Sequence, residues 1–216
     1  MTLPFPEAAP DDDQIETGRL LFRKRTEFLK GVVAMDGLPP DDRAEICFAG
    51  RSNVGKSSLI NALTDTKGLA RASNTPGRTQ EINYFTLEDL YLVDLPGYGF
   101  ANAPVKVVAQ WQALMKSYLS GRATLRRAFL LIDHRHGPKP VDEEIMSLLD
   151  RAAVPFQAVL TKADKVKAAE RDRTQAALRE ALARHPAAFP EIIVTSSEKG
   201  TGIDILRAVI SGVNLN

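Results

Sequence analysis

The sequence predicts an α/β protein with a mostly parallel, six-stranded sheet and helices on both faces. From residue 45 onward, short apolar segments alternate with segments of helical periodicity, which is the order expected of a parallel sheet covered by helices. The apolar segments are brief and nearly uninterrupted, as in strands that are buried on both faces. The predicted strands cover residues 45–49, 82–87, 90–94, 127–132, 156–160 and 191–195.

Five segments that follow these strands carry apolar residues at steps of three or four, the period of a helix with one buried face. They come after the first, third, fourth, fifth and sixth predicted strands. The apolar residues, in chain order, are Leu59, Ile60 and Leu63; Val107, Trp111, Leu114 and Tyr118; Ile145, Leu148 and Leu149; Leu178, Ala181 and Leu182; and Ile203, Leu206, Val209, Ile210 and Val213.

The chain of 216 residues has a formal net charge of +1 and a single cysteine, Cys47. Its length fits one domain with a short extension, and the small net charge gives no global attraction to nucleic acid or membrane. A lone cysteine excludes an intramolecular disulfide and fits a reducing compartment, and its apolar neighbours predict a buried strand residue. We expect a disordered tail over residues 1–18, an arm over residues 19–44 and the α/β domain over residues 45–216.

The N-terminus lacks the basic and apolar regions of a signal peptide. No apolar run reaches the roughly 18 residues that a membrane-spanning helix needs. We therefore expect a cytoplasmic protein without membrane contact, and a monomer as the default state.

Residues 50–57 read GRSNVGKS and fit the phosphate-binding pattern G-x-x-x-x-G-K-[ST] between a strand and a helix. The glycines let backbone N–H groups surround phosphate oxygens, and the helix N-terminus adds positive potential. Lys56 is predicted to neutralise the β- and γ-phosphates and Ser57 to bind Mg²⁺. The pattern indicates the P-loop NTPase fold, and the predicted phosphate-binding residues are Gly50, Arg51, Ser52, Asn53, Val54, Gly55, Lys56, Ser57 and Ser58.

Asp94-Leu95-Pro96-Gly97 ends the third predicted strand. An acid there can hold Mg²⁺ through a water, and the Gly97 N–H can bond the γ-phosphate. The Gly- and Pro-rich loop at residues 74–80 offers Thr79 as a second hydroxyl ligand, and loss of the γ-phosphate would release this loop as a switch. The predicted catalytic residues are Lys56, Thr79 and Gly97, and the predicted metal ligands are Ser57, Thr79 and Asp94.

Thr161-Lys162-Ala163-Asp164 follows the fifth predicted strand. The Asp164 carboxylate can accept hydrogen bonds from two N–H groups of guanine, whereas adenine would leave it unpaired. The stem of Lys162 can lie along the base, and a backbone N–H near Ser196 and Ser197 can reach guanine O6. The alternatives are a solvated turn at this place and, for the whole chain, a P-loop ATPase or small-molecule kinase.

Several segments resemble the EngB-type family (YihA/YsxC) of bacterial ribosome-assembly GTPases, within the translation-factor-related (TrmE-Era-EngA-EngB-Septin-like) class. The likeness covers roughly residues 20 to 213. It implies a G domain over residues 45–216 that binds GTP, GDP and Mg²⁺. The similar segments are AGRSNVGKSSLIN at 49–61, NTPGRTQ at 74–80, DLPGYGFA at 94–101, DHRHGP at 133–138 and TKAD at 161–164.

The resemblance also implies roles for particular residues and a cellular role. Asp94 to Gly97 would form one switch, and Thr161 to Asp164 would enclose the base together with Thr195, Ser196 and Ser197. The implied role is in assembly of the large ribosomal subunit, with precursor rRNA and ribosomal proteins as partners, and in cell division and septation. The residues of the other switch would be Gly77, Arg78, Thr79, Gln80 and Glu81.

Two positions depart from the commonest GTPase pattern. Thr161 replaces the usual Asn of N-K-x-D, which predicts a weaker contact to guanine N7 or to the P-loop. Tyr98 stands where many GTPases carry the Gln that orients the attacking water, so we expect turnover on the order of 10⁻³ s⁻¹ or below without help. Asn53 resembles the P-loop Asn of potassium-activated relatives, so K⁺ is a further expected cofactor.

The sequence therefore predicts a GTP-binding protein with slow GTPase activity that acts as a switch in ribosome assembly. Two alternatives stay open: a nucleotide-dependent binding module on a ribosomal precursor, and a septum-associated scaffold, each with little catalysis of its own. His134, Arg135 and His136 follow the fourth predicted strand, where RNA contact and a solvated loop are both possible outcomes.

Overall fold

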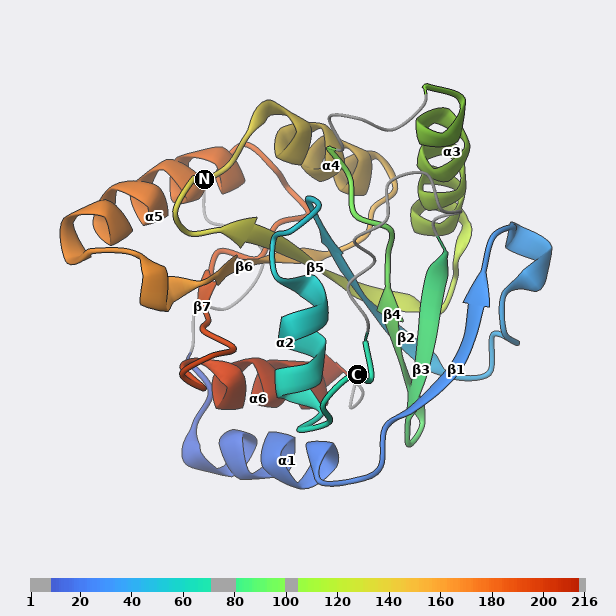
Figure 1. Ribbon diagram of the computed structural model, residues 1–216, viewed down its shortest axis with the longest axis horizontal. Coiled ribbons are helices and arrows are strands. Elements are labelled where there is room, and N and C mark those ends of the chain that lie inside the picture. Colours follow the sequence, from blue (N-terminus) through green and yellow to red (C-terminus); the bar gives the residue numbers. More distant parts are fainter. Residues whose placement is uncertain (1–8, 71–80, 100–104, 214–216) are drawn as a thin grey trace.

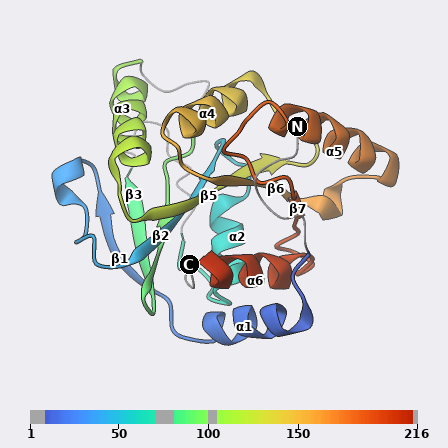
Figure 2. The same cartoon turned by 180° about the vertical axis from the view of Figure 1, so that it is seen from behind.

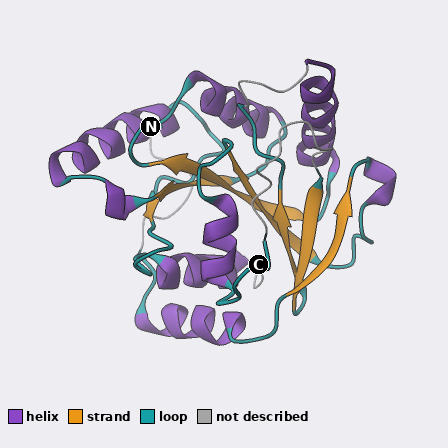
Figure 3. Ribbon diagram, in the orientation of Figure 1, coloured by secondary structure: helices purple, strands orange, loops and turns teal. Residues whose placement is uncertain are grey.

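The computed structural model of the protein describes residues 9–70, 81–99 and 105–213, without the side chains of residues 105–108 and Trp111. Within these ranges a central sheet carries helices on both faces (Figure 1, Figure 3). The strands are β1 (Glu27–Val32), β2 (Ala44–Gly50), β3 (Ile82–Leu87), β4 (Leu90–Asp94), β5 (Leu125–Asp133), β6 (Phe156–Thr161) and β7 (Ile193–Val194). The helices are α1 (Asp12–Phe22), α2 (Lys56–Leu63), α3 (Val105–Gly121), α4 (Pro140–Arg151), α5 (Ala168–Leu182) and α6 (Ile203–Val213), with short 3₁₀ turns η1 (Met35–Gly37) and η2 (Ala163–Lys165).

The strands lie in the order β1-β3-β4-β2-β5-β6-β7. The five from β4 to β7 are parallel, whereas β3 is antiparallel to both of its neighbours. The prediction of a mostly parallel sheet with helices on both faces is confirmed. The prediction of six strands is wrong, because the described residues form a seven-stranded sheet.

The additional strand, β1, lies inside the predicted arm. It occupies an edge of the sheet and pairs only with β3, from Glu27 opposite Thr86 to Val32 opposite Ile82. Four of its six residues are exposed, so it lacks the apolar run by which the buried strands are recognised. Its backbone pairing with β3 is accompanied by an edge-on ring contact between Phe28 and Phe85.

The prediction of a disordered tail over residues 1–18 is wrong for the residues from Asp11 onward. Asp11 accepts a hydrogen bond from the Gln14 N–H at 2.8 Å and its own N–H donates to the Gln14 side chain at 2.9 Å, which is a capping box at the start of α1. The acidic residues that suggested disorder therefore lie at a helix N-terminus, where negative charge is favourable. Residues 1–8 are outside the described residues.

Helix α1 lies along α6, outside the main layers (Figure 1, Figure 2). A Cβ atom at Gly18 would come within 2.4 Å of the Ala208 nitrogen, so the two helix backbones touch at this point. Phe22, at the end of α1, is 3 % exposed and joins the core formed by α2 and α6. The helix thus packs on α6 and not on the sheet itself (Figure 1).

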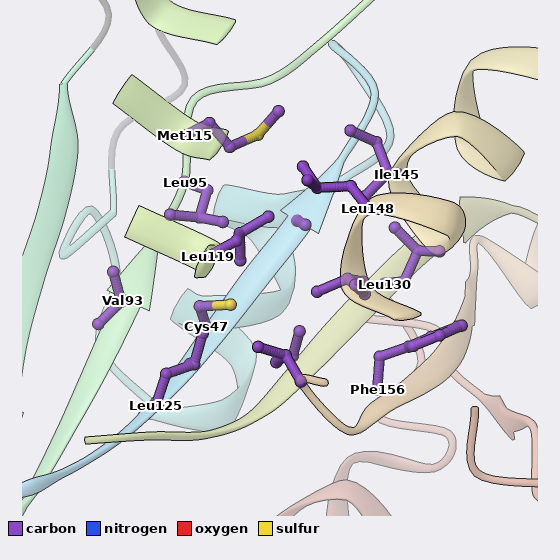
Figure 4. Packing of buried hydrophobic residues seen from close by; sticks show 14 of the residues in the cluster. Cys47, Val93, Leu95, Met115, Leu119, Leu125, Leu130, Ile145, Leu148 and Phe156 are labelled. Carbon is purple, nitrogen blue, oxygen red and sulfur yellow. The ribbon is translucent and has the colours of Figure 1, made fainter. Parts of the chain in front are cut away.

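Two apolar layers enclose the sheet. One forms between the sheet and α3, α4 and α5, and the other between the sheet and α2 and α6. Cys47 of β2 is fully buried in the first layer, facing Leu119 of α3 and Leu130 of β5 (Figure 4), which confirms the expected buried strand cysteine. Burial raises the pKa of its thiol well above the usual range. Predicted core positions Val107 and Trp111 have side chains outside the described residues.

The parallel strands end at one edge of the sheet, and their register brings chemically important residues into line there. Asp94 at the end of β4 pairs with Phe48 in β2, and Asp133 at the end of β5 pairs with Thr161 at the end of β6. Loops that follow parallel strands meet at this carboxyl edge.

Among the described helices, none is both long and apolar enough to pass through a bilayer.

Candidate nucleotide-binding site

The predicted P-loop connects β2 to α2 at the carboxyl edge of the sheet. Gly50 is the last residue of β2, and Lys56 is the first residue of α2. Gly55 has a φ of 106°, and Asn53 has a φ of 60°, so the chain twice enters the left-handed region before the helix starts. Glycine adopts this conformation at no steric cost. The arrangement aims the first N–H groups of α2 out of the helix end, as anion binding requires.

Lys56 and Asp94 meet beside the P-loop. The Lys56 ammonium contacts Asp94 Oδ1, and the two side chains are 12 % and 7 % exposed. Ser57 follows Lys56 in the first turn of α2. The contact with Lys56 brings Asp94 beside the first turn of α2, which carries Ser57. A hydroxyl and a carboxylate are oxygen donors that Mg²⁺ prefers, so Ser57 and Asp94 fit the predicted metal.

Part of the predicted first switch cannot be compared with the structure. Gly77, Arg78, Thr79 and Gln80 lie outside the described residues, and with them the second predicted hydroxyl ligand. Glu81 is exposed immediately before β3.

The segment after β4 runs against the P-loop. The Leu95 N–H donates to the Phe48 carbonyl at 3.1 Å, and a Cβ atom at Gly97 would lie 3.2 Å from the Ser52 Cα. Glycine at this position therefore permits close approach of the two backbones. This contact places the Gly97 peptide at the mouth of the P-loop, as the sequence predicted.

Tyr98 points away from that mouth. Its side chain is 1 % exposed, and its hydroxyl donates to Asp142 Oδ1 in α4 at 2.8 Å. Burial, together with the nearby Asp142 carboxylate, raises the pKa of the Tyr98 hydroxyl well above its usual value. This orientation agrees with the expectation that Tyr98 does not orient an attacking water.

Thr161 is tied to the P-loop. Its hydroxyl donates to the Val54 carbonyl at 2.7 Å and is buried. The sequence predicted that threonine in place of asparagine would weaken either a base contact or a P-loop contact. The structure shows that the threonine hydroxyl does contact the P-loop.

Asp164 lies in the turn η2 that follows β6, in the segment for which the sequence predicts the guanine contact. Its Oδ1 accepts a hydrogen bond from the Ser196 hydroxyl at 2.6 Å, and this bond, followed by the Lys165 ammonium, lowers the pKa of the carboxyl group. Oδ2 is buried without a hydrogen bond from any described residue, although the Lys165 Nζ lies 3.2 Å away. A carboxylate oxygen that faces one ammonium and accepts no hydrogen bond from the described residues can accept the N–H groups of guanine.

The loop after β7 supports Asp164. The Thr195 hydroxyl donates to the Leu160 carbonyl at 3.0 Å, and the Thr195 carbonyl accepts from the Ala163 N–H at 3.1 Å. The Ser196 N–H is engaged with the Thr201 carbonyl at 3.0 Å. A backbone contact from this loop to guanine O6 would therefore come from Ser197.

Sequence reasoning missed the role of Asp133, the last residue of β5. Its carboxylate accepts hydrogen bonds from Lys162 Nζ at 2.9 Å and from both Nε and Nη2 of Arg135 at 2.9 and 2.7 Å. Lys162 Nζ also donates to the Asn53 carbonyl at 2.6 Å. Although burial alone would raise the pKa of Asp133, the bonds from Arg135 and Lys162 lower it well below its usual range.

The available signal for Asp133 was an acid at the carboxyl end of an apolar strand, the same signal that identified Asp94. His134 is fully buried, so neither a solvated position nor RNA contact applies to it, whereas Arg135 and His136 are exposed.

Comparison with known proteins agrees with this geometry. Residues 45–162 match a family described as "50S ribosome-binding GTPase". The fold and the loops at its carboxyl edge define a P-loop GTPase, an enzyme that binds and hydrolyses GTP.

Curated relatives and a solved structure narrow the class. The chain is 74 % identical to "Probable GTP-binding protein EngB" of Jannaschia sp. (strain CCS1), over 98 % of both chains. It is 73 % identical to the protein of that name from Ruegeria pomeroyi, over 97 % of both chains. A crystal structure of a probable GTP-binding protein engB superposes with a TM-score of 0.64 at 28 % identity, covering 80 % of this chain and 99 % of that one. The chain belongs to the EngB family of GTP-binding proteins.

Proposed function

We propose that this GTPase is a cytoplasmic, monomeric switch that acts in assembly of the large ribosomal subunit and that normal cell division and septation require it. The observation that supports the ribosomal part is the match of residues 45–162 to a family described as a 50S ribosome-binding GTPase. Precursor rRNA and ribosomal proteins are the proposed partners. The proposed requirement in cell division and septation rests on the family resemblance.

In the proposed complex the nucleotide lies along the carboxyl edge of the sheet. The backbone from Gly50 to Ser58 surrounds the α- and β-phosphates, Lys56 neutralises the β- and γ-phosphates, and the Gly97 N–H donates to the γ-phosphate. Thr161, Lys162, Ala163 and Asp164 enclose the guanine ring with Thr195, Ser196 and Ser197. The pairing of Asp164 with Ser196 supports this assignment, because it fixes the carboxylate and leaves Oδ2 for the base.

Mg²⁺ would be held by Ser57, Thr79 and Asp94, and when bound it would spread the charge of the β- and γ-phosphates. Chelation with EDTA is expected to weaken GTP binding more than GDP binding, and equal weakening would contradict the contact to the γ-phosphate. Asn53 is the proposed residue toward K⁺. Equal hydrolysis rates in potassium and sodium buffers would exclude that role.

The chain's own residues account for slow hydrolysis. Lys56 and the N–H groups of the P-loop and of Gly97 stabilise charge on the transferred group, and Thr79 would order the first switch. The Tyr98 hydroxyl is bound to Asp142, so it does not position water. We therefore propose intrinsic turnover on the order of 10⁻³ s⁻¹ or less, raised by a partner.

The deciding experiment is association with ribosomal particles in two nucleotide states. Full-length protein loaded with a non-hydrolysable GTP analogue is expected to co-sediment with large-subunit particles more than protein loaded with GDP. Lys56→Ala, which loses the phosphate-neutralising ammonium, serves as the control and is expected to lose the difference. Equal association in both states would reject the switch, and co-sedimentation with division complexes alone would favour the septum-associated scaffold.

A further inference from the structure

Tyr98 lies shortly before residues 100–104, which are outside the described residues. Its side chain is buried, and hydrogen bonds of its backbone N–H and carbonyl hold it in place. Its N–H donates to the Gly50 carbonyl at 3.2 Å, and its carbonyl accepts from the Ser52 N–H at 2.8 Å. These bonds form an isolated parallel bridge between Arg51 and Tyr98. The backbone of Tyr98, the residue directly after Gly97, is therefore hydrogen-bonded to the P-loop.

The side chain of Tyr98 adds a third attachment, to Asp142 of α4. Asp142 is fully buried, and each of its oxygens has a donor: the Tyr98 hydroxyl reaches Oδ1 at 2.8 Å and the Lys139 N–H reaches Oδ2 at 2.9 Å. The Arg51 Nε lies 3.3 Å from Oδ2. A buried carboxylate that loses a charge-assisted hydrogen bond is strongly destabilised, so these contacts hold each other in place.

Arg51 is the P-loop residue whose side chain lies beside Asp142. It is the first residue after β2, and its side chain is only 21 % exposed. Its aliphatic stem lies 3.8 Å from where a Cβ atom of Gly99 would be, so it packs along the segment that follows Gly97. The P-loop, the segment after β4 and the start of α4 thus meet in one buried polar cluster.

We propose that Tyr98, Asp142 and Arg51 are positioning residues that hold the Gly97 peptide against the P-loop, so that its N–H is in place for the γ-phosphate. The inference rests on the proposed function, in which the Gly97 N–H distinguishes GTP from GDP. It assigns α4 a part in γ-phosphate recognition, because Asp142 belongs to α4 and not to any nucleotide loop. None of these three side chains needs to touch the reacting atoms.

The test compares two variants of the full-length protein, each of which loses one tyrosine hydroxyl group. Tyr98→Phe removes the hydroxyl on Asp142, and Tyr118→Phe removes a hydroxyl that donates to the fully buried Glu45 at 2.9 Å. Glu45 lies near the start of β2, at the opposite end from Gly50. The readouts are affinities for GDP and for a non-hydrolysable GTP analogue, and the single-turnover rate of GTP hydrolysis.

Tyr98→Phe is expected to weaken binding of the GTP analogue about fivefold and to change the affinity for GDP by less than about twofold. It is also expected to slow GTP hydrolysis. Tyr118→Phe is expected to keep the wild-type ratio of the two affinities, even where it lowers thermal stability. A purely structural role for Tyr98 would make the two variants alike, with the ratio unchanged, and would overturn the inference.

Gly97→Ala separates this inference from the proposed function. If Gly97→Ala changes the ratio of GTP to GDP affinity and Tyr98→Phe does not, only the positioning role is wrong. If neither changes it, the γ-phosphate contact of Gly97 is wrong. Should Tyr98→Phe not fold, Arg51→Met removes the cluster's guanidinium from a partly exposed position and is expected to alter the same ratio, whereas an unaltered ratio would reject the role.

Discussion

The Thr161 hydroxyl donates to the Val54 carbonyl at 2.7 Å, which joins the loop proposed to bind guanine directly to the P-loop. These residues are separated by 107 positions in the chain, yet the bond lies between the two places where the ends of a nucleotide would sit. Together with the bond from Lys162 Nζ to the Asn53 carbonyl, this buried hydrogen bond holds the predicted phosphate site and the predicted base site next to each other.

Thr161→Val tests this connection. The variant keeps the shape of the side chain but leaves the Val54 carbonyl without its buried donor, so we expect a loss of about 1 to 2 kcal/mol in unfolding free energy and about fivefold weaker GDP binding. Urea unfolding and equilibrium titration measure the two quantities. Thr64→Val is the control, since it removes a buried hydroxyl that donates to the Ile60 carbonyl at 2.9 Å. It should lower stability alone, and weaker GDP binding there would contradict the specific role of Thr161.

Asp164→Asn is expected to shift the base preference of the protein from guanine toward xanthine. The amide donates where the carboxylate accepted, so GTP affinity should fall roughly a hundredfold and xanthosine triphosphate should bind better than in the wild type. Competition titration with both nucleotides gives the result. Glu198→Gln is the matched change on an exposed carboxylate nearby, which pairs with Lys165 at 2.8 Å, and should alter neither affinity. Unchanged GTP affinity in Asp164→Asn would remove Asp164 from the base site.

Asp133→Asn should destabilise the protein in a pH-dependent manner. The folded-state pKa of Asp133 is below its unfolded value of about 3.9, so its ion pairs contribute fully above that pH and are lost as the pH falls toward the folded pKa. We expect a deficit of about 2 kcal/mol at pH 7 that narrows below about pH 4. Denaturant titrations across pH 3 to 7 measure it. Asp89→Asn removes an exposed acid in the β3–β4 turn and should show no deficit; a constant deficit in Asp133→Asn would argue against the ion pairs.

Asp133→Asn should also weaken the binding of guanine nucleotides. Without the carboxylate, Lys162 Nζ keeps only the Asn53 carbonyl, so its stem is less firmly held along the proposed base. GDP and GTP analogue affinities are expected to fall by the same factor, about threefold, because the γ-phosphate is not involved. A change confined to GTP would show that Asp133 acts elsewhere.

Gly18→Val should separate α1 from α6. The added side chain would enter space within 2.4 Å of the Ala208 backbone, and overpacking of this kind costs about 2 kcal/mol. Nucleotide affinity should stay unchanged, because α1 is remote from the carboxyl edge of the sheet. Gly121→Ala at the end of α3, where nothing lies within 4 Å of the added Cβ atom, should change stability by less than about 1 kcal/mol. Equal stability of Gly18→Val and the wild type would mean that α1 does not dock as described.

The sequence by itself determined the P-loop, the buried strands and the order of the loops at the carboxyl edge. The reason is that these features are local: glycine spacing sets the backbone of residues 50–57, and a short apolar run specifies a strand buried on both faces. The position of Asp164 after the fifth predicted strand extended this prediction to guanine, and the family resemblance extended it to the expected ribosomal role.

Only the tertiary structure decided the contacts that cross the chain. The acids of α1 suggested disorder, whereas in the structure they lie in its capping box and first turn, and the helix docks on α6. The strand β1 has four exposed residues and pairs with the edge that β3 offers. Asp133 holds Lys162, and Tyr98 turns inward to Asp142, because the strand ends bring them within hydrogen-bond distance. Such contacts depend on distances between segments far apart in the chain, which no local pattern specifies.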